Sequence, residues 1–143
     1  MQGINIYSGA GGLGSALTNP TELAYRKGVL KERYPILFRK RRWPDVETAY
    51  LTLRGEDHVE NERLMVELIA AKFTQHPSLT AQVIEKGGRE FLMKCSHFTN
   101  ARSEHFQWWE GEGMASPFIR LLVAGFDMAQ AGSATQDGQV SLF

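Results

Sequence analysis

A strongly amphipathic stretch at 61–75 is the feature that most limits how this chain can fold. It places Leu64, Leu68 and Phe73 near one side at helical spacing, and Pro77 stands two residues after its end. This spacing predicts a long helix that ends before the proline. Because a helix with one apolar face must bury that face against other elements, the chain is expected to fold in packed layers around it.

Shorter elements are predicted on both sides of this helix. Proline and acidic residues at 44–47 indicate a helix start, and Gly55 closes that helix. The next predicted helix has Ser78 as its cap and ends at Gly87-Gly88, and a final helix is capped by Ser116. Short strands are expected at 4–7 and 36–38. The segment 89–98 fits a strand or a short helix equally well, and 99–112 reads as a loop. The predicted class is α+β, mainly α-helical with a few short strands, in one domain over 1–131.

Composition narrows the class of protein further. The chain has 143 residues and balances 16 basic against 16 acidic side chains. This balance argues against a protein that coats nucleic acid regardless of its sequence, but it does not exclude a local basic patch. Cys95 is the single cysteine, which suits a reducing compartment, and the start of the chain lacks the pattern of a signal peptide. No apolar run is long enough for a membrane span, so a cytoplasmic protein with no membrane partner is predicted.

The glycine-rich loop at 8–15 contains a literal G-x-G-x-x-G from Gly9 to Gly14. In dinucleotide-binding folds such a loop opens a long helix, but here Pro20 interrupts it and no repeating β-α-β pattern follows. Two interpretations stay open. The loop is a structural turn, or its backbone N–H groups at Gly11 and Gly12 contact a phosphate.

The helix after Pro44 carries a possible polar site. Glu47, Tyr50 and Arg54 are spaced so that they share one helical stripe, with Trp43 just before them. A carboxylate, a phenol and a guanidinium on one stripe either line a cleft or form an ordinary solvated face.

Other candidate groups are ambiguous from the sequence alone. The run 39–42, which includes Arg39 and Arg41, is either a solvated loop or a phosphate-facing rim. Trp109 and its neighbour Trp108 are either core or ligand contacts. Cys95 reads as a buried packing residue. The histidines have no metal-ligand spacing, so neither a metal nor another cofactor is expected.

Four segments, taken in order, resemble the NADAR (YbiA-like) family. The segment 42–54, RWPDVETAYLTLR, resembles a motif with an aromatic-proline pair, Val-Glu, Ala-Tyr and a cation seven residues after the glutamate. Thr18-Asn19, the helix pair at 68–88 and the Trp-Gly region at 108–126 resemble further family segments. The likeness spans about residues 4–126 and implies a YbiA-like fold.

The resemblance implies an N-glycosidase that hydrolyses the bond between ribose and a base or amine. Members of the family cleave ribosylated riboflavin precursors or remove ADP-ribose from guanine bases. By this likeness Glu47 is the catalytic carboxylate. Arg39 and Arg41, with Gly11 and Gly12, would receive phosphates. The residues expected to contact substrate are Asn19, Trp43, Tyr50, Arg54, Trp109 and Gly111.

Several family positions differ in this chain. Arg54 stands where the family has lysine, and Glu110 separates Trp109 from Gly111. These differences motivate an alternative in which the same pocket binds ADP-ribose or a nucleotide without turnover. A further alternative is an adaptor that works only through its tail.

The end of the chain has the composition of a linker followed by a short peptide. Residues 132–143 are expected to form a flexible tail. Its last five residues, 139–143, resemble the bacterial sliding-clamp binding peptide through Gln139, Leu142 and Phe143. Either this peptide docks on a DNA sliding clamp, or it packs back on the domain.

Overall fold

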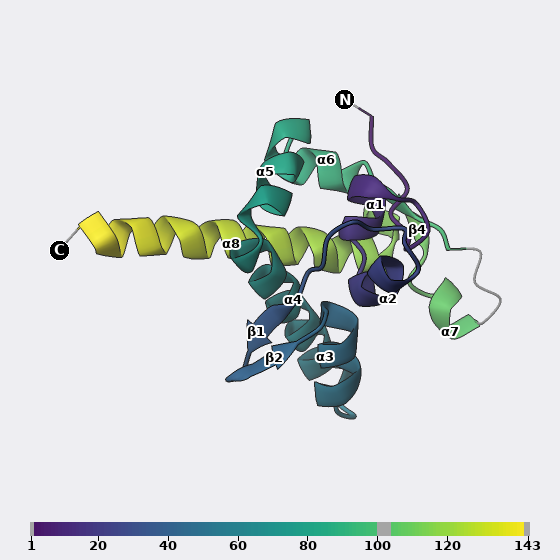
Figure 1. Cartoon of the computed structure of the whole chain (residues 1–143), viewed down its shortest axis with the longest axis horizontal. Helices are drawn as coiled ribbons and strands as arrows, with labels where there is room; N and C mark the ends of the chain where they lie inside the picture. Colours follow the sequence, from purple (N-terminus) through teal and green to yellow (C-terminus); the bar gives the residue numbers. More distant parts are fainter. Residues whose placement is uncertain (1, 100–103, 142–143) are drawn as a thin grey trace.

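Two long helices form the centre of the molecule. The computed structural model describes the backbone of residues 2–99 and 104–141, and the side chains of these residues except 105 and 133–141. Helix α4 (His58–Gln75) crosses helix α8 (Pro117–Ser141), and this pair shares the most extensive contact between any two described elements (Figure 1). The long amphipathic helix expected from the sequence is therefore confirmed, and α8 is its main partner.

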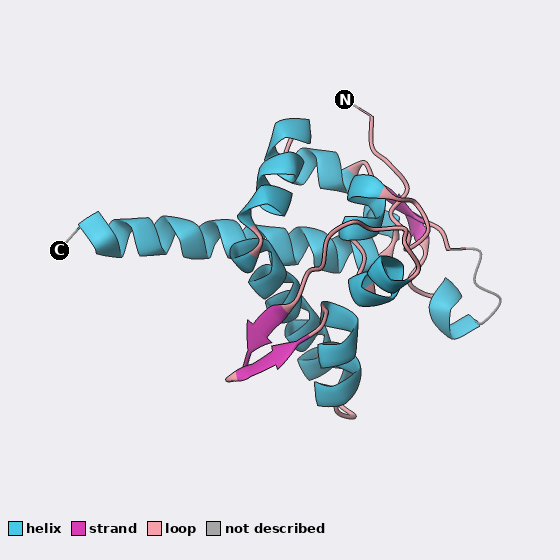
Figure 2. Ribbon diagram, viewed as in Figure 1, coloured by secondary structure: helices cyan, strands magenta, loops and turns pink. Residues whose placement is uncertain are grey.

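Shorter elements surround this crossing. The bounds of the remaining described helices are α1 (Gly12–Ala16), α2 (Thr21–Arg26), α3 (Val46–Leu53), α5 (Pro77–Lys86), α6 (Arg89–Met93), α7 (Glu104–Gln107) and the 3-10 turn η1 (Gly113–Ala115). Two antiparallel strand pairs complete the fold: β1 (Ile36–Phe38) with β2 (Arg41–Trp43), and β3 (Ser96–His97) with β4 (Gly111–Glu112) (Figure 2). The class is α+β and mainly helical, as the sequence predicts.

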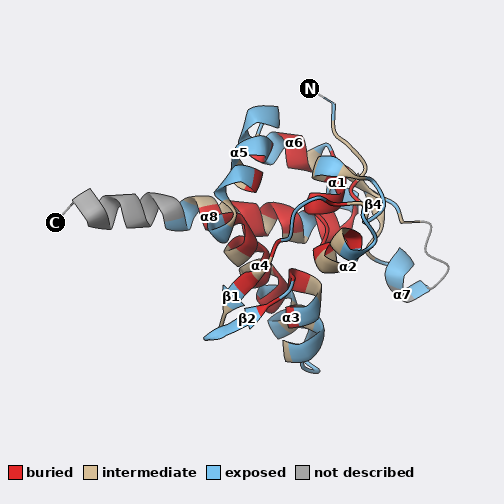
Figure 3. Cartoon of the chain, in the orientation of Figure 1, coloured by how far each residue is buried: buried red, intermediate tan, exposed pale blue. Residues whose placement is uncertain are grey.

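Many of the buried residues lie where α4 and α8 meet (Figure 3). Leu68, Phe73 and Ile119 are among the residues buried there, and the Phe73 ring meets Phe126 edge-on at 5.3 Å between centroids. Gly125 marks the closest approach of the two helices, because a Cβ atom there would lie 2.4 Å from Ile69 Cγ2. The crossing distance thus depends on the absence of a side chain at this position.

Helix ends follow local chemistry, with two changes from the sequence-based expectation. Asp45 is the N-cap of α3 and not a first-turn residue, because its side chain accepts from Thr48 N. Helix α5 begins at Pro77, so His76 and not Ser78 occupies the cap position. The expected ends at Gly87 and Gly88 and the Ser116 cap are confirmed; Ser116 Oγ accepts from Ile119 N at 3.2 Å.

Three ambiguous segments also become defined. The segment 89–98 contains both expected forms, since α6 is followed by β3. The loop expected at 99–112 includes the one-turn helix α7 and strand β4. The strand expected at 4–7 is reduced to a single parallel bridge between Asn5 and Ser96, although Ile6 N also donates to Ser96 O at 2.8 Å. Cys95 is fully buried, as expected.

The C-terminal segment continues as helix where a linker was expected. Helix α8 runs past the expected domain end at 131 to Ser141 and extends away from the rest of the molecule (Figure 1). No proline interrupts the chain after Pro117, although Gly132 and Gly138 lower the helix propensity of this part. The backbone of 132–141 is thus helical, while Leu142 and Phe143 lie outside the described residues.

None of the helices in the described part of the chain combines enough length with enough apolar character to cross a bilayer.

The α4–α8 crossing generates a stability prediction at Gly125. We expect Gly125→Ala to lower the free energy of unfolding by about 1–3 kcal/mol, because the added methyl group would overlap Ile69 and force the helices apart. Urea unfolding followed by circular dichroism measures this change.

Gly132→Ala is the matched control in the same helix. A Cβ atom at position 132 meets nothing within 4 Å, so this substitution should be neutral or stabilise by up to about 1 kcal/mol. Equal effects of the two substitutions would contradict the close crossing.

Candidate functional site

The start of α3 is fixed by the buried carboxylate of Asp45, which is only 3% exposed. Its Oδ1 accepts from Thr48 N at 2.8 Å, and its Oδ2 accepts from Glu22 N at 3.0 Å. One carboxylate therefore joins the N-terminal ends of α2 and α3. The dipoles of both helices favour a negative charge at this place.

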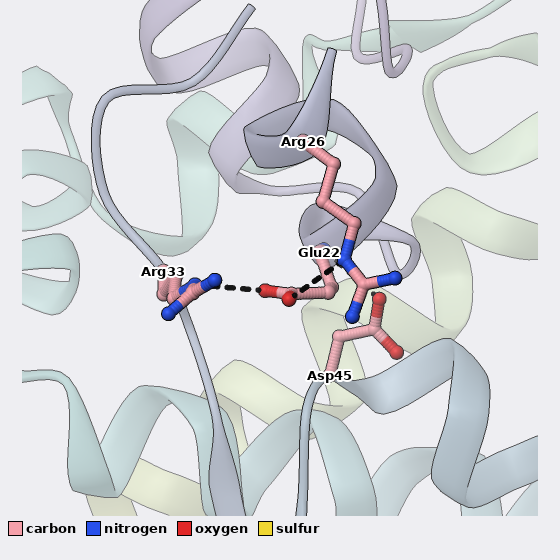
Figure 4. Close-up of polar contacts among 4 residues, drawn as sticks. All are labelled: Glu22, Arg26, Arg33 and Asp45. Atoms are coloured by element: carbon pink, nitrogen blue, oxygen red, sulfur yellow. Dashed lines mark hydrogen bonds and ion pairs between the residues drawn. The ribbon is translucent and has the colours of Figure 1, made fainter. Parts of the chain in front are cut away.

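Two arginines neutralise Glu22 beside this junction (Figure 4). Arg26 Nε lies 3.1 Å from Glu22 Oε2, and Arg33 Nε lies 3.4 Å from Glu22 Oε1. Both arginines are largely exposed, so these pairs contribute little to stability. Their effect is to leave Asp45 as the buried negative charge at the junction.

The segment 16–19 is held against α3 and α4 by buried polar contacts. Lys72 Nζ, on α4, donates to Ala16 O and to Thr18 O at 2.5 and 2.7 Å. Asn19 O accepts from Glu47 N at 3.2 Å. The Asn19 side chain is 7% exposed and donates to Met65 Sδ at 3.3 Å. Asn19 therefore adjoins Glu47 through its backbone. Its side-chain amide faces Met65 on α4, whereas the family resemblance implied a contact with substrate.

The stripe expected on α3 leads to a cleft. A hollow of about 510 Å³ lies beside Tyr50 and Arg54. Further lining comes from the first turn of α4 and from the region of α7, notably His58, Glu62, Trp108 and Trp109. Glu47 does not itself line this hollow. It is partly buried, one helical turn before Tyr50 on the same stripe.

The electrostatics of the stripe are linked. Burial raises the pKa of Glu47, the Asp45 carboxylate raises it further, and the Arg54 guanidinium opposes both. Burial also raises the pKa of Tyr50, with Arg54 opposing and the carboxylates of Glu47 and Glu62 adding to the rise. The partly buried carboxyl group of Glu47 therefore holds a proton more tightly than an exposed glutamate does, and Arg54 is the neighbour that favours its ionised form.

The two tryptophans form an aromatic side of the cleft. Trp108 is 57% exposed, and its ring meets Trp109 edge-on with 4.8 Å between centroids. Trp109 is partly buried and packs against the core. An exposed indole beside a hollow offers a flat face on which a heterocycle can stack. The structure thus brings Trp109 together with Tyr50 and Arg54 at the cleft. It also places Trp108 there, which the sequence could assign either to the core or to a ligand contact.

Two residues expected to contact substrate have other roles. Trp43 is 3% exposed, its Nε1 donates to Phe38 O at 3.1 Å, and the Arg41 guanidinium lies 4.2 Å from its ring centroid. Its ring is therefore used in packing, and the stacking role expected for it is corrected. Gly111 does not line the cleft. A Cβ atom there would lie 2.9 Å from Ser116 N, so this glycine permits a close backbone contact.

The glycine loop lies elsewhere. Gly11 and Gly12 adopt positive φ angles of 78° and 51°, and Gly11 N donates to Ser15 Oγ at 2.7 Å. The following helix α1 has only five residues. A second hollow of about 460 Å³ lies beside Gly11, Tyr7 and Lys86, and it shares no lining residue with the cleft. Gly11 thus uses its N–H within the loop, which favours the structural turn over the phosphate contact.

The basic run also lies apart from the cleft. Arg39 and Arg41 belong to the hairpin of β1 and β2, are exposed, and are not among the lining residues. The structure therefore does not bring the expected phosphate-binding residues to Glu47. Gln139 lies in α8 but its side chain is not described, so the expected partner contacts at 139–143 fall outside the described side chains.

The remaining lining residues were missed because they meet the stripe only in space. His58 and Glu62 belong to the first turns of α4, where the sequence shows only a polar helix start.

No group of three or more His, Cys, Asp or Glu side chains suited to a metal ion occurs among the residues that the structure describes. Comparison of the chain with protein-family models, with curated proteins and with solved structures finds no match.

The buried Lys72 generates a prediction about pH. Burial lowers its pKa from 10.5 to about 7, with the Asp45 carboxylate opposing the shift. Between these values the unfolded chain keeps a proton that the folded chain has released. The free energy of unfolding therefore rises with pH through this window, by up to about 1.4 kcal/mol per pH unit.

Lys72→Met should remove that contribution. We expect the stability difference between the unmodified protein and the variant to grow as pH is raised above about 7, as measured by urea unfolding across the window. Lys86→Met, at an exposed position, should keep the unmodified slope. Parallel pH profiles for Lys72→Met and the unmodified protein would contradict a buried, titrating Lys72. Because Lys72→Met also leaves two carbonyl groups without their donor, NMR titration of the lysine side chain gives a second measurement.

Proposed function

We propose that this protein is an N-glycosidase that hydrolyses the bond between ribose and a base or amine. Removal of ADP-ribose from a guanine base is the favoured reaction, and a related ribosylated metabolite is the other substrate considered. The proposal rests on Glu47, which is partly buried and has a raised pKa. Glu47 shares one helical stripe with Tyr50 and Arg54, and these two residues line a cleft with aromatic and cationic side chains. The resemblance of 42–54 to the NADAR motif supports the same residue.

The chemistry requires a carboxylate near the sugar. As the bond between ribose and base breaks, positive charge develops on the sugar ring. Glu47 in its ionised form would stabilise that charge and take a proton from the attacking water, so that the water oxygen bonds to the sugar carbon. The electron pair of the broken bond leaves with the base, which then gains a proton. The partial burial of Glu47 strengthens its electrostatic effect.

The cleft would hold the rest of the substrate. Arg54 would bind a ribose or phosphate oxygen with two parallel N–H groups, which a lysine cannot do. Trp108 and Trp109 would contact the base, and Tyr50 would donate its hydroxyl proton to the substrate, since its raised pKa keeps that proton in place. Glu47 stands one turn from this cleft, so the substrate must reach inward along α3 to meet it.

A binding module that recognises ADP-ribose or a nucleotide without turnover is the second candidate. It is favoured by the absence of Glu47 from the residues that line the cleft. In that case the tryptophans and Arg54 would hold the ligand, and Glu47 would stay a partly buried structural carboxylate.

Glu47→Gln tests the enzymatic proposal. The amide has nearly the same shape but cannot accept a proton, so turnover should fall by on the order of 100-fold or more while the fold is kept. The assay follows release of free base from ADP-ribosylated guanosine by purified protein.

Glu85→Gln is the control for this test, because Glu85 is exposed on α5 and does not line the cleft. It should retain full turnover. Equal rates for Glu47→Gln and the unmodified protein would remove Glu47 from the reaction. Ligand binding without product would select the binding module.

We also propose that the C-terminal peptide 139–143 docks on a bacterial DNA sliding clamp. The proposal rests on its likeness to the clamp-binding pattern and on its place at the end of α8, which projects from the molecule (Figure 1). Leu142 and Phe143 would fill an apolar pocket, and Gln139 would fix the orientation. A cytoplasmic location, which the single free cysteine supports, would place the protein with this partner.

A truncation tests the docking peptide. We expect protein ending at Gly138 to lose binding to purified clamp in a pull-down, while its melting temperature stays close to that of the full chain. Undiminished clamp binding by the truncated protein would contradict this proposal without affecting the one for Glu47. If truncation after Gly138 abolishes the effect of the protein in cells and Glu47→Gln does not change that effect, the protein is an adaptor.

A further inference from the structure

The hairpin of β1 and β2 concentrates positive charge at one projecting point. Residues 39–42 are Arg-Lys-Arg-Arg, and all four side chains are exposed. They form the turn and the first part of β2, at the end of a two-stranded ribbon that extends from the body beside α3 (Figure 1). We name residues 36–43 the basic hairpin.

These charges have no acidic partners in the described structure. The ion pairs found among described residues involve Arg26, Arg33 and Arg89, and none involves residues 39–42. The wider segment 26–42 contains eight of the 16 basic residues of the chain and one acidic residue, Glu32. Arg26 and Arg33 of this segment pair with Glu22, so the positive charge that no ion pair among the described residues offsets includes all four residues of 39–42.

The turn of the basic hairpin uses an unfavourable backbone. Arg39 and Lys40 have φ angles of 52° and 63°, the left-handed region at both central positions. A two-residue turn of this kind strongly prefers Asn-Gly, because a side chain at positive φ costs about 1 kcal/mol or more per residue. Charged residues in both positions indicate that the cations serve a purpose other than stability.

The rest of the hairpin is firmly held, so the tip is presented in a fixed place. The Gln75 side chain, from α4, donates to Leu37 O at 2.8 Å and accepts from Leu37 N at 2.7 Å. A ring nitrogen of His76 lies 2.6 Å from Pro35 O. The guanidinium groups of Arg39 and Arg41 lie over the rings of Phe38 and Trp43, at 5.3 and 4.2 Å from the centroids. Stacking reduces the side-chain freedom that these arginines would lose on binding.

We propose that the basic hairpin is a docking surface for the phosphodiester backbone of a nucleic acid. Guanidinium groups match phosphate oxygens in a two-pronged arrangement, and a two-stranded ribbon is narrow enough to follow a groove. A membrane surface fits less well, because Leu37 is the one large apolar side chain that residues 36–43 expose, and a single such side chain gives little insertion between lipids. This inference stands apart from the glycosidase proposal, since no residue of 39–42 lines the cleft.

The test replaces the turn by the sequence that its backbone prefers. Arg39→Asn with Lys40→Gly removes two charges and relieves the strain at both positions. We expect the melting temperature to rise, while affinity for a fluorescein-labelled DNA duplex of about 20 base pairs falls by on the order of tenfold. In fluorescence anisotropy titrations over a salt series, the slope of log K against log salt should decrease in magnitude by up to about 2. A stabler protein that binds less DNA cannot be explained by misfolding.

A control separates local docking from general charge. Lys86→Gln with Lys94→Gln removes the same number of charges from exposed positions outside the hairpin, and should leave affinity and salt slope nearly unchanged. The proposal is overturned if the hairpin variant binds DNA as tightly as the unmodified protein, or if both double variants lose affinity equally. It is also overturned if the protein binds phosphatidylserine vesicles through the hairpin but does not bind duplex or single-stranded DNA. Turnover of a nucleoside-sized substrate would depend on Glu47 and the residues of the cleft and not on residues 39–42, so either proposal can fail while the other holds.

Discussion

The burial of α4 against α8 is the contact on which the other features depend. Helix α4 ends at Gln75, whose side chain bonds to the basic hairpin. One turn earlier, Lys72 bonds to the segment 16–18. The first turns of α4 supply Glu62 to the cleft. Because apolar burial between two helices is favourable over their whole contact, one crossing fixes the positions of three polar regions. The small residue at Gly125 allows that crossing to be close.

Buried polar groups near Glu47 restrict how the surrounding helices can pack, and their burial lowers stability. Asp45 and Lys72 are each 3% exposed, yet no ion pair joins them among the described contacts. Each instead bonds to backbone groups, Asp45 to N–H groups and Lys72 to carbonyl oxygens. A buried charge without a direct counter-ion is expensive, so these groups restrict the way in which α2, α3 and α4 can meet. The environment that results raises the pKa of Glu47.

The candidate site was only partly visible in the sequence. The stripe of Glu47, Tyr50 and Arg54 follows from helical spacing alone, and the structure places the last two beside a cleft. Trp109 was also expected there, but its distance from α3 in sequence gave no basis for pairing it with Tyr50. Trp43 adjoins the stripe in sequence and yet lies in the core, because the strand it ends turns its indole toward Phe38. Proximity along the chain was therefore a poor guide to which aromatic residues face a ligand.

The sequence by itself determined the local elements. Helical spacing, the cap at Ser116 and the glycines at 87–88 all act within a few residues, so they are readable without a fold. The tertiary structure alone decided how buried Glu47 is, which residues join Tyr50 at the cleft, and that the charges of 39–42 lie on a fixed hairpin away from it. Burial and electrostatic neighbours come from contacts between residues far apart in the chain, and local patterns carry no information about those contacts.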